Sequence, residues 1–220
     1  MIRRAPSTAA QRTRVQKIAN ALQQTMPAPK MELDHRSPWE LLVATILSAQ
    51  CTDERVNKVT PALFKRYRTA ADLAKARLTD VEQLIRSTGF FKSKAKNIIA
   101  CSQALTERFH GQVPSTLDDL TSLPGVGRKT ANVVLGNAFD QPAIIVDTHV
   151  KRVANRLGLT KSNDPDQIET DLQRLFPPSQ WTVASQRLLL HGRYLCTARA
   201  PQCHQCPISA HCPWNKKGSP

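Results

Sequence analysis

The stretch Leu123–Leu135 reads LPGVGRKTANVVL and restricts the possible fold more than any other part of the chain. Pro124 cannot continue a helix and Gly125 accepts a positive φ, so a helix that precedes them must end here. Beyond the glycines, apolar residues recur at helical spacing, namely Ala131, Val134, Leu135 and Ala138. We therefore predict two helices joined by a short hairpin, with the second helix beginning near Arg128.

The first of these helices has a recognisable start. Ser115 is followed three residues later by Asp118, which is the pattern of a capping box. Apolar positions follow at helical spacing, at Leu117, Leu120 and Leu123. The pattern predicts that Ser115 is the N-cap of the helix that leads into the hairpin.

The backbone of the hairpin is unshielded because Gly125 and Gly127 carry no side chains. Free N–H groups at the start of a helix, together with the helix dipole, attract an anion. The alternative is a glycine-capped turn with a purely structural role. The neighbouring cations Arg128 and Lys129 favour a phosphate ligand over that alternative.

The charge balance points to a polyanionic partner. Lysine and arginine number 31 and aspartate and glutamate 17, so the formal net charge is +14. Solubility or attraction to a membrane surface is the alternative explanation. No apolar run approaches the ~20 residues that span a bilayer, and the N-terminal stretch lacks the apolar segment of a secretory signal. We expect no membrane partner and a cytoplasmic protein, in which disulfides are disfavoured.

Helical periodicity continues through most of the chain, and no strand-like alternation of useful length is present. The helices expected besides those of the hairpin cover about 13–26, 38–49, a segment capped by Asp53, and then 70–75, 79–87, 93–109, 148–157, 165–176 and 181–194. We expect the apolar helix 38–49 to be the buried centre of a domain, and residues 1–11 to be disordered. The fold class is predicted to be all-α.

Four of the six cysteines lie near the C-terminus with the spacing C-x6-C-x2-C-x5-C: Cys196, Cys203, Cys206 and Cys212. Four thiolates so close together in a reducing compartment indicate a metal site. Tetrahedral zinc and an iron–sulfur cluster both accept four cysteines, so the spacing leaves both open. Disulfide pairing is the remaining alternative. Cys101 lies in a helical apolar pattern and is expected to be a buried small residue, while Cys51 has no assigned role.

Taken together, LPGVGRKTANVVL, VDTHV and HGRYLC followed by the cysteine spacing resemble the endonuclease III family, the bifunctional DNA glycosylases of the helix–hairpin–helix superfamily. The resemblance extends from about Val15 to Cys212. It implies one helical domain at 31–141 and an iron–sulfur domain formed by 1–30 and 142–220, with the active site in the groove between them. It also favours a 4Fe–4S cluster on the four cysteines over zinc.

The resemblance assigns the chemistry residue by residue. It implies that Lys129 is the nucleophile and that Asp147 is its carboxylate partner. A lysine amine forms a Schiff base with an opened sugar, and the acid stabilises the cationic transition state or takes a proton. The structural alternatives are a solvated cation at the helix start for Lys129 and an N-cap for Asp147.

Further DNA contacts follow from the same resemblance. It implies that the hairpin, with Gly125, Gly127 and Arg128, holds a phosphate. Gln50 matches the residue that fills the gap left by an extruded nucleotide. Phe90 matches an apolar wedge that is usually leucine, and this departure leaves the preference for the opposite base open. His149 either contacts a phosphate or packs.

The implied function is base excision repair of double-stranded DNA that contains damaged bases or abasic sites. The enzyme would remove oxidised pyrimidines and cleave the strand on the 3′ side by β-elimination. One alternative is a monofunctional adenine or mismatch glycosylase, which lacks the lysine, and another is a non-catalytic DNA-binding module. We expect a monomer, associated with the nucleoid through DNA.

Overall fold

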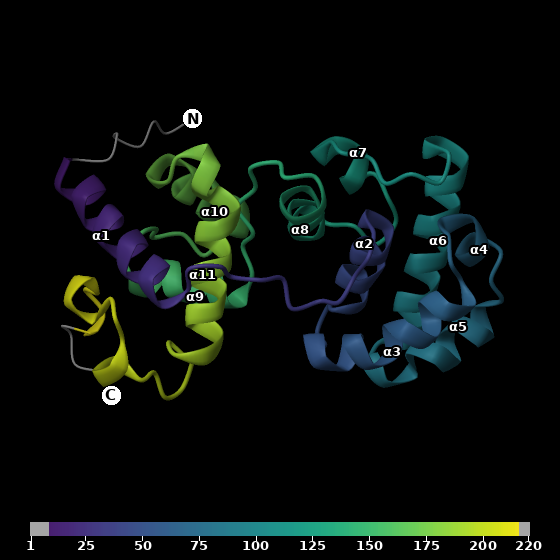
Figure 1. Ribbon diagram of the computed structural model, residues 1–220, viewed down its shortest axis with the longest axis horizontal. Helices are drawn as coiled ribbons and strands as arrows, with labels where there is room; N and C mark the ends of the chain where they lie inside the picture. The colour runs from purple at the N-terminus through teal and green to yellow at the C-terminus, as the bar shows by residue number, and fades with distance from the viewer. Residues whose placement is uncertain (1–8, 216–220) are drawn as a thin grey trace. The chain divides into compact units, whose positions relative to one another are not determined.

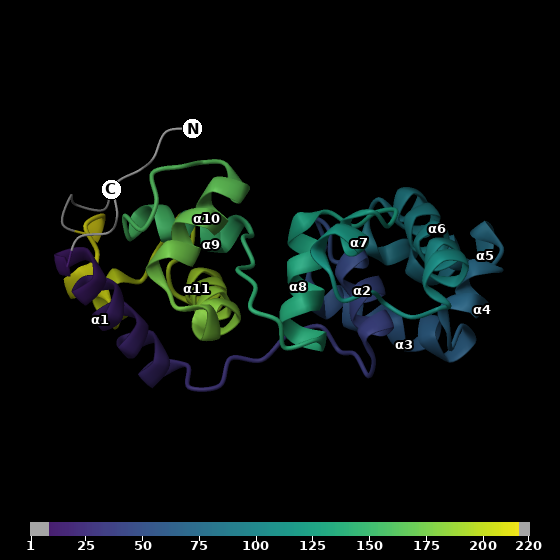
Figure 2. The same cartoon turned by 90° about the horizontal axis from the view of Figure 1, so that it is seen from above.

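The computed structural model describes residues 9–215, and within that range all regular secondary structure is helical. The prediction of an all-α fold is confirmed. The chain divides into two compact units, Met31–Gln141 and Met1–Lys30 with Pro142–Pro220. Figure 1 and Figure 2 show the helices of each unit. Among the described residues, no helix is long and apolar enough to cross a membrane.

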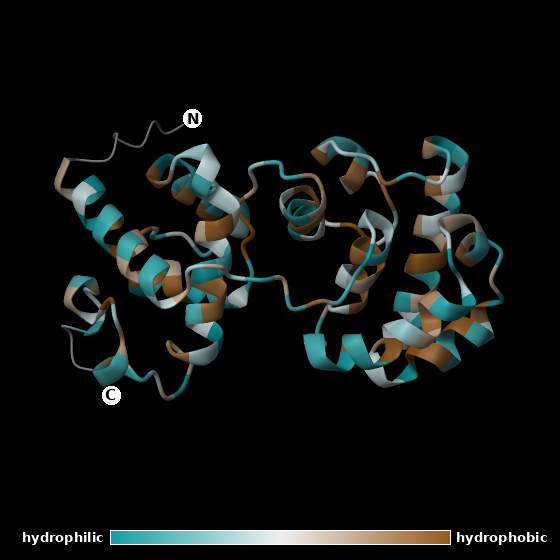
Figure 3. Cartoon of the chain, in the orientation of Figure 1, coloured by the Kyte–Doolittle hydropathy of each residue, from teal (hydrophilic) through white to brown (hydrophobic). Residues whose placement is uncertain are grey.

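The unit Met31–Gln141 is built around a central apolar helix, α2. Its elements are α2 (Pro38–Leu47), α3 (Asp53–Arg66), α4 (Ala70–Ala74), α5 (Leu78–Ile85), the 3-10 helix η1 (Arg86–Thr88), α6 (Phe91–Phe109), α7 (Leu117–Thr121) and α8 (Arg128–Ala138). The side chain of Ser37 caps α2, and Pro38 occupies its first position. Eight of the ten residues of α2 are buried, and the helix contacts α3, α6 and α8. Figure 3 shows the hydrophobic residues along α2 and α5.

The second unit combines the N-terminal helix with the C-terminal part of the chain. Its elements are α1 (Ala9–Thr25), α9 (Thr148–Arg156), α10 (Pro165–Leu175), the 3-10 helix η2 (Pro178–Gln180), α11 (Trp181–Tyr194), and the 3-10 helices η3 (Cys203–Gln205) and η4 (Ser209–His211). Val15, Ile18 and Leu22 of α1 are buried in one core with residues of α9, α10 and α11. This apolar burial holds the N-terminal helix against a segment more than a hundred residues away in the sequence.

Two predicted caps lie one residue away from the observed ones. Thr116, not Ser115, caps α7, because its Oγ1 accepts from the N–H of Asp119 at 3.2 Å. Likewise Thr52, not Asp53, caps α3. In both places adjacent residues are good caps, and the pattern alone does not select between them. The expectation of disorder at 1–11 is wrong for residues 9–11, which belong to α1, while residues 1–8 lie outside the described range.

Candidate functional site

The hairpin between α7 and α8 has the form that its glycines predict. Gly125 has φ +76, and a Cβ built there would lie 2.8 Å from the Cβ of Asn97 in α6. Only glycine therefore fits without displacing α6. Gly127 is the N-cap of α8 with an ordinary φ of −91 and no side chain to cap the helix. The first turn of α8 consequently offers backbone donors to an anion at an exposed surface.

Lys129 lies in the first turn of α8, beside the glycines. Its side chain is exposed, as is that of Arg128. Val126 in the hairpin is buried and anchors the loop to the helical unit. The hairpin thus brings Gly125, Gly127, Arg128 and Lys129 together on one short segment, so a phosphate bound to the backbone would lie close to a primary amine.

Asp147 is fixed at the end of a buried extended segment. Residues 143–146 are apolar and buried, and Asp147 then caps α9 by accepting from the N–H of Val150 at 2.7 Å. The expected capping role is confirmed. Within the described residues the second carboxylate oxygen, Oδ2, has no hydrogen-bond partner, so the cap leaves one oxygen available. Asp147 belongs to the second unit and Lys129 to the first.

His149 packs within its own unit. Arg152 donates to its Nδ1 at 3.2 Å, which leaves the proton of a neutral ring on Nε2. Its Cβ lies against α11, where a Cβ built on Gly192 would be 3.0 Å away. The glycine in HGRYLC is therefore needed for close approach of α9 and α11. Of the two expectations for His149, packing is the one that these contacts support.

Gln50 and Phe90 share an unusual backbone conformation. Gln50 has φ +52 and Phe90 has φ +47, so both lie in the left-handed region that non-glycine residues seldom occupy. Phe90 is 68% exposed, although it is a large apolar side chain, whereas Phe91 is half-buried as the first residue of α6. Strained residues of this kind gather at functional sites, and both turns belong to the unit Met31–Gln141.

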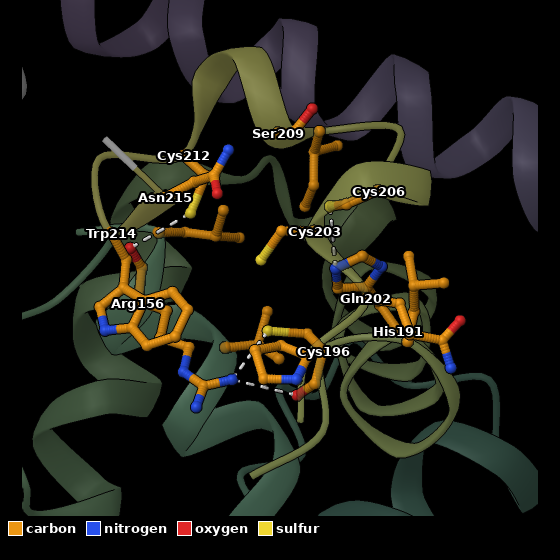
Figure 4. Close-up of a pocket in the computed structure, with 15 residues that line it drawn as sticks. Arg156, His191, Cys196, Gln202, Cys203, Cys206, Ser209, Cys212, Trp214 and Asn215 are labelled. Carbon is orange, nitrogen blue, oxygen red and sulfur yellow. Dashed lines mark hydrogen bonds between the residues drawn. The ribbon is translucent and has the colours of Figure 1, made fainter. Parts of the chain in front are cut away.

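The four C-terminal cysteines line one cavity. Figure 4 shows the thiols of Cys196, Cys203, Cys206 and Cys212 around a common space. All four are free cysteines, so the disulfide alternative is not what the structure adopts. In the described part of the chain, no three His, Cys, Asp or Glu side chains lie close enough together to hold a single metal ion. The thiols instead surround a space, which is the arrangement that a cluster of several atoms needs.

Two side chains that the sequence patterns did not single out reach the cysteine cavity or its loop. Arg156 donates to Cys196 Sγ at 3.2 Å, to the carbonyl of Thr197 at 2.7 Å and to that of Ala198 at 2.9 Å. Arg152 donates to the carbonyl of Cys196 at 3.1 Å. Cationic donors to sulfur and to the carbonyls of the ligand loop suit an anionic thiolate cluster.

His191, one of three histidines near the cysteines, also reaches the cavity. Its Nε2 lies 3.7 Å from Cys206 Sγ. The side chain is buried, and burial lowers the pKa of His191 to about 4. The tautomer of the ring determines which of the two groups donates in this contact.

The comparisons with known proteins agree with this geometry. A family model described as "HhH-GPD superfamily base excision DNA repair protein" matches residues 43–178, and the "Iron-sulfur binding domain of endonuclease III" matches residues 196–212. The first match spans more than half of the chain and defines its class as a base excision DNA repair protein.

The curated relatives narrow that class. Endonuclease III of Synechocystis sp. is 51% identical over 93% of this chain and 94% of the relative. Endonuclease III of Escherichia coli (strain K12) is 42% identical over 91% of this chain and 95% of the relative. A solved "Trapped Endonuclease III-DNA Covalent Intermediate" superimposes with a TM-score of 0.90 at 44% identity, covering 94% of this chain and 97% of that one.

The chain therefore belongs to the endonuclease III family. It is a base excision repair enzyme, a DNA glycosylase with AP-lyase activity, and its C-terminal loop is an iron–sulfur site. The sequence-based predictions of the family, the enzyme class and the 4Fe–4S cofactor are confirmed.

Proposed function

We propose that Lys129 is the nucleophile of this enzyme and that Asp147 is its acid–base partner. The observation that carries the proposal is the state of the Asp147 carboxylate: one oxygen is held at 2.7 Å by the N–H of Val150 and the other is open. A carboxylate fixed in this way is preorganised toward developing positive charge. Lys129, exposed in the first turn of α8, provides the amine beside a hairpin suited to phosphate.

The proposed reaction begins at the anomeric carbon of an extruded nucleotide. The nitrogen of Lys129 forms a bond to C1′ while the bond from C1′ to the base breaks, and the base leaves with the electron pair and accepts a proton. Asp147 stabilises the cationic sugar and accepts the proton that the attacking amine loses. The ring then opens, and the product is a Schiff base between Lys129 and the sugar.

Strand cleavage follows from the Schiff base. A proton leaves C2′, the electron pair forms a double bond to C3′, and the C3′–O bond breaks with phosphate as the leaving group. Water then hydrolyses the imine and regenerates Lys129. An iron–sulfur cluster bound by Cys196, Cys203, Cys206 and Cys212 would supply no step of this chemistry, because all its ligand positions are filled by protein, and it would hold the C-terminal loop in shape.

The remaining proposed contacts concern extrusion and binding. Phe90 and Gln50 would act as wedge and gap-filler, which offset the few kcal/mol that flipping a nucleotide costs. Gly125, Gly127 and Arg128 would hold a phosphate. We propose oxidised pyrimidines in double-stranded DNA as the substrates, a monomeric enzyme made of two domains that match the two compact units, and a cytoplasmic location at the nucleoid.

Borohydride trapping tests the nucleophile. The wild-type enzyme with borohydride and an abasic duplex should give a covalent adduct that maps to Lys129 by peptide mass spectrometry. Lys129→Gln should give no adduct and should nick at least about 10³-fold more slowly, because without the amine no Schiff base can form. Normal trapping and nicking by Lys129→Gln would show that the assignment is wrong. A panel of duplexes with thymine glycol, dihydrouracil, an abasic site or a mismatch tests the lesion class.

A further inference from the structure

Lys94 is a buried cation for which the proposed mechanism has no use. It lies in the first turns of α6 and is only 4% exposed. Its Nζ donates to the carbonyl of Thr88 at 2.7 Å, and Thr88 is itself buried. Burial lowers the pKa of Lys94, which shows that the surroundings oppose its charge. Burial of an ammonium near the N-terminus of a helix destabilises the folded protein, which suggests that Lys94 has a role beyond packing.

The hydrogen bond of Lys94 closes a strained turn. Thr88 ends η1, and both residues that separate it from α6 have a positive φ: Gly89 with φ +68, which glycine adopts without strain, and Phe90 with φ +47 in the left-handed region. The side chain of Thr88 is fixed by donation to the carbonyl of Ile85 at 2.8 Å. At the other end of the turn, the N–H of Lys94 donates to the carbonyl of Phe90 at 3.1 Å. Lys94 thus hydrogen-bonds this turn at two points, through its side chain at Thr88 and through its backbone at Phe90.

The exposure of Phe90 depends on this turn. A left-handed conformation is unfavourable for an aromatic residue and persists only where neighbouring contacts impose it. Phe90 is the N-cap residue of α6, and its side chain makes no capping hydrogen bond. The ring is 68% exposed, so hydrophobic burial does not hold it in place. In the described structure the hydrogen bonds of Thr88 and Lys94 therefore hold the backbone on either side of Phe90.

We propose that Lys94 is a positioning residue for nucleotide extrusion: through its hydrogen bond to the Thr88 carbonyl it keeps the Gly89–Phe90 turn in the conformation that projects the Phe90 ring toward DNA. The inference rests on the proposed wedge role of Phe90. Lys94 touches neither the sugar nor the base, and it acts by fixing the wedge before the enzyme meets its substrate. Preorganisation of this kind lowers the barrier to extrusion, because the ordering cost is already met in the free enzyme.

Lys94→Met is the main test, because methionine keeps the length and apolar stem of lysine and removes the charged donor. Lys96→Met is the matched control, since Lys96 is exposed on the same helix and its loss changes the net charge equally. Lys94→Arg retains a cationic donor, and Phe90→Ala removes the wedge itself. Each variant is first compared with wild type for its helical circular dichroism and its iron–sulfur absorbance.

Three readouts follow for each folded variant: single-turnover base release from a thymine glycol duplex, unstacking reported by 2-aminopurine next to the lesion, and nicking of an abasic site in single-stranded DNA. Lys94→Met should slow duplex base release about tenfold to 10²-fold, as displacement of a positioning contact does, and should lower the 2-aminopurine signal. Nicking of the single strand needs no extrusion and should change less than about threefold. Lys94→Arg should recover most of the duplex rate.

Equal duplex rates for Lys94→Met and Lys96→Met would overturn the inference, and so would an equal loss on duplex and single-stranded substrates. If Lys94→Met does not fold, Lys94→Gln, which is also neutral, takes its place with the same expectations. Failure of the underlying function is distinguishable. A wild-type enzyme without duplex activity refutes the proposed function. Phe90→Ala with the wild-type duplex rate refutes the wedge role. An inactive Phe90→Ala beside a fully active Lys94→Met refutes only the role of Lys94.

Discussion

Asp147 has a structural role as the cap of α9 and, in the proposed mechanism, a chemical role as well, and two substitutions separate the two roles. Its Oδ1 caps α9 through the N–H of Val150, while the charge is the feature that the proposed reaction uses. Asparagine and aspartate are about equally good N-caps, so Asp147→Asn keeps an acceptor at the cap and removes the charge. Asp147→Ala removes both the acceptor and the charge.

The expected magnitudes follow from these contacts. Loss of an N-cap acceptor costs about 1 kcal/mol, and loss of a negative charge from a helix N-terminus costs about 0.5 kcal/mol. Asp147→Ala should therefore lower the free energy of unfolding by about 1.5 kcal/mol, and Asp147→Asn by about 0.5 kcal/mol. Both variants lack the carboxylate charge, so both should release base at least about 10²-fold more slowly.

Urea unfolding followed by circular dichroism gives the two stabilities, and single-turnover release of thymine glycol from a duplex gives the two rates. The stabilities of the two variants should differ, while their rates should fall together. A wild-type rate for Asp147→Asn would refute the role of the charge. A stability for Asp147→Asn as low as that of Asp147→Ala would refute the account of the cap.

Three further predictions concern other parts of the molecule. Gly125→Ala should lower the free energy of unfolding by about 2 kcal/mol, because alanine is strained at φ +76 and would meet Asn97. The control is Gly127→Ala, where a Cβ meets nothing within 4 Å. In the same urea titration it should change the free energy of unfolding by less than about 1 kcal/mol. Arg156→Met should lose iron–sulfur absorbance several-fold faster under air than the exposed control Lys161→Met, since it removes donors to Cys196 Sγ and to the loop carbonyls; equal decay rates would refute this. Cys101 should resist iodoacetamide at pH 8 in the folded protein and react after denaturation, because burial raises the pKa of its thiol to about 12; mass spectrometry of the labelled peptides measures both.

The helices and the hairpin could be predicted because their signals are local. Pro38 after Ser37 marked the start of α2, and the spacing of apolar residues defined α11 over the observed range Trp181–Tyr194. Gly125 predicted a positive φ, and the structure has φ +76 at this residue. Where two adjacent residues serve equally well as caps, as at Ser115 and Thr116, the local pattern does not select between them, and the structure places the cap at Thr116.

The contacts around the cysteines and around Phe90 join residues that no local pattern relates. Arg156 reaches Cys196 across 40 residues of sequence, and nothing in the spacing of either residue encodes the pair. Lys94 interrupts the apolar face of α6, and its charge predicts a surface position, yet it is buried and donates to the carbonyl of Thr88. The left-handed backbones of Gln50 and Phe90 are likewise tertiary features, since isolated Gln and Phe avoid them.

The helix α9 has the proposed catalytic acid at one end and an arginine that binds the cysteine loop at the other. Asp147 precedes its first residue, and Arg156, its last residue, binds the segment from Cys196 to Ala198. Each residue of a helix turns the chain by about 100°. An insertion or deletion of one residue within α9 would therefore rotate either the acid or the arginine away from its partner. The length of this helix is consequently fixed by the groups at its two ends.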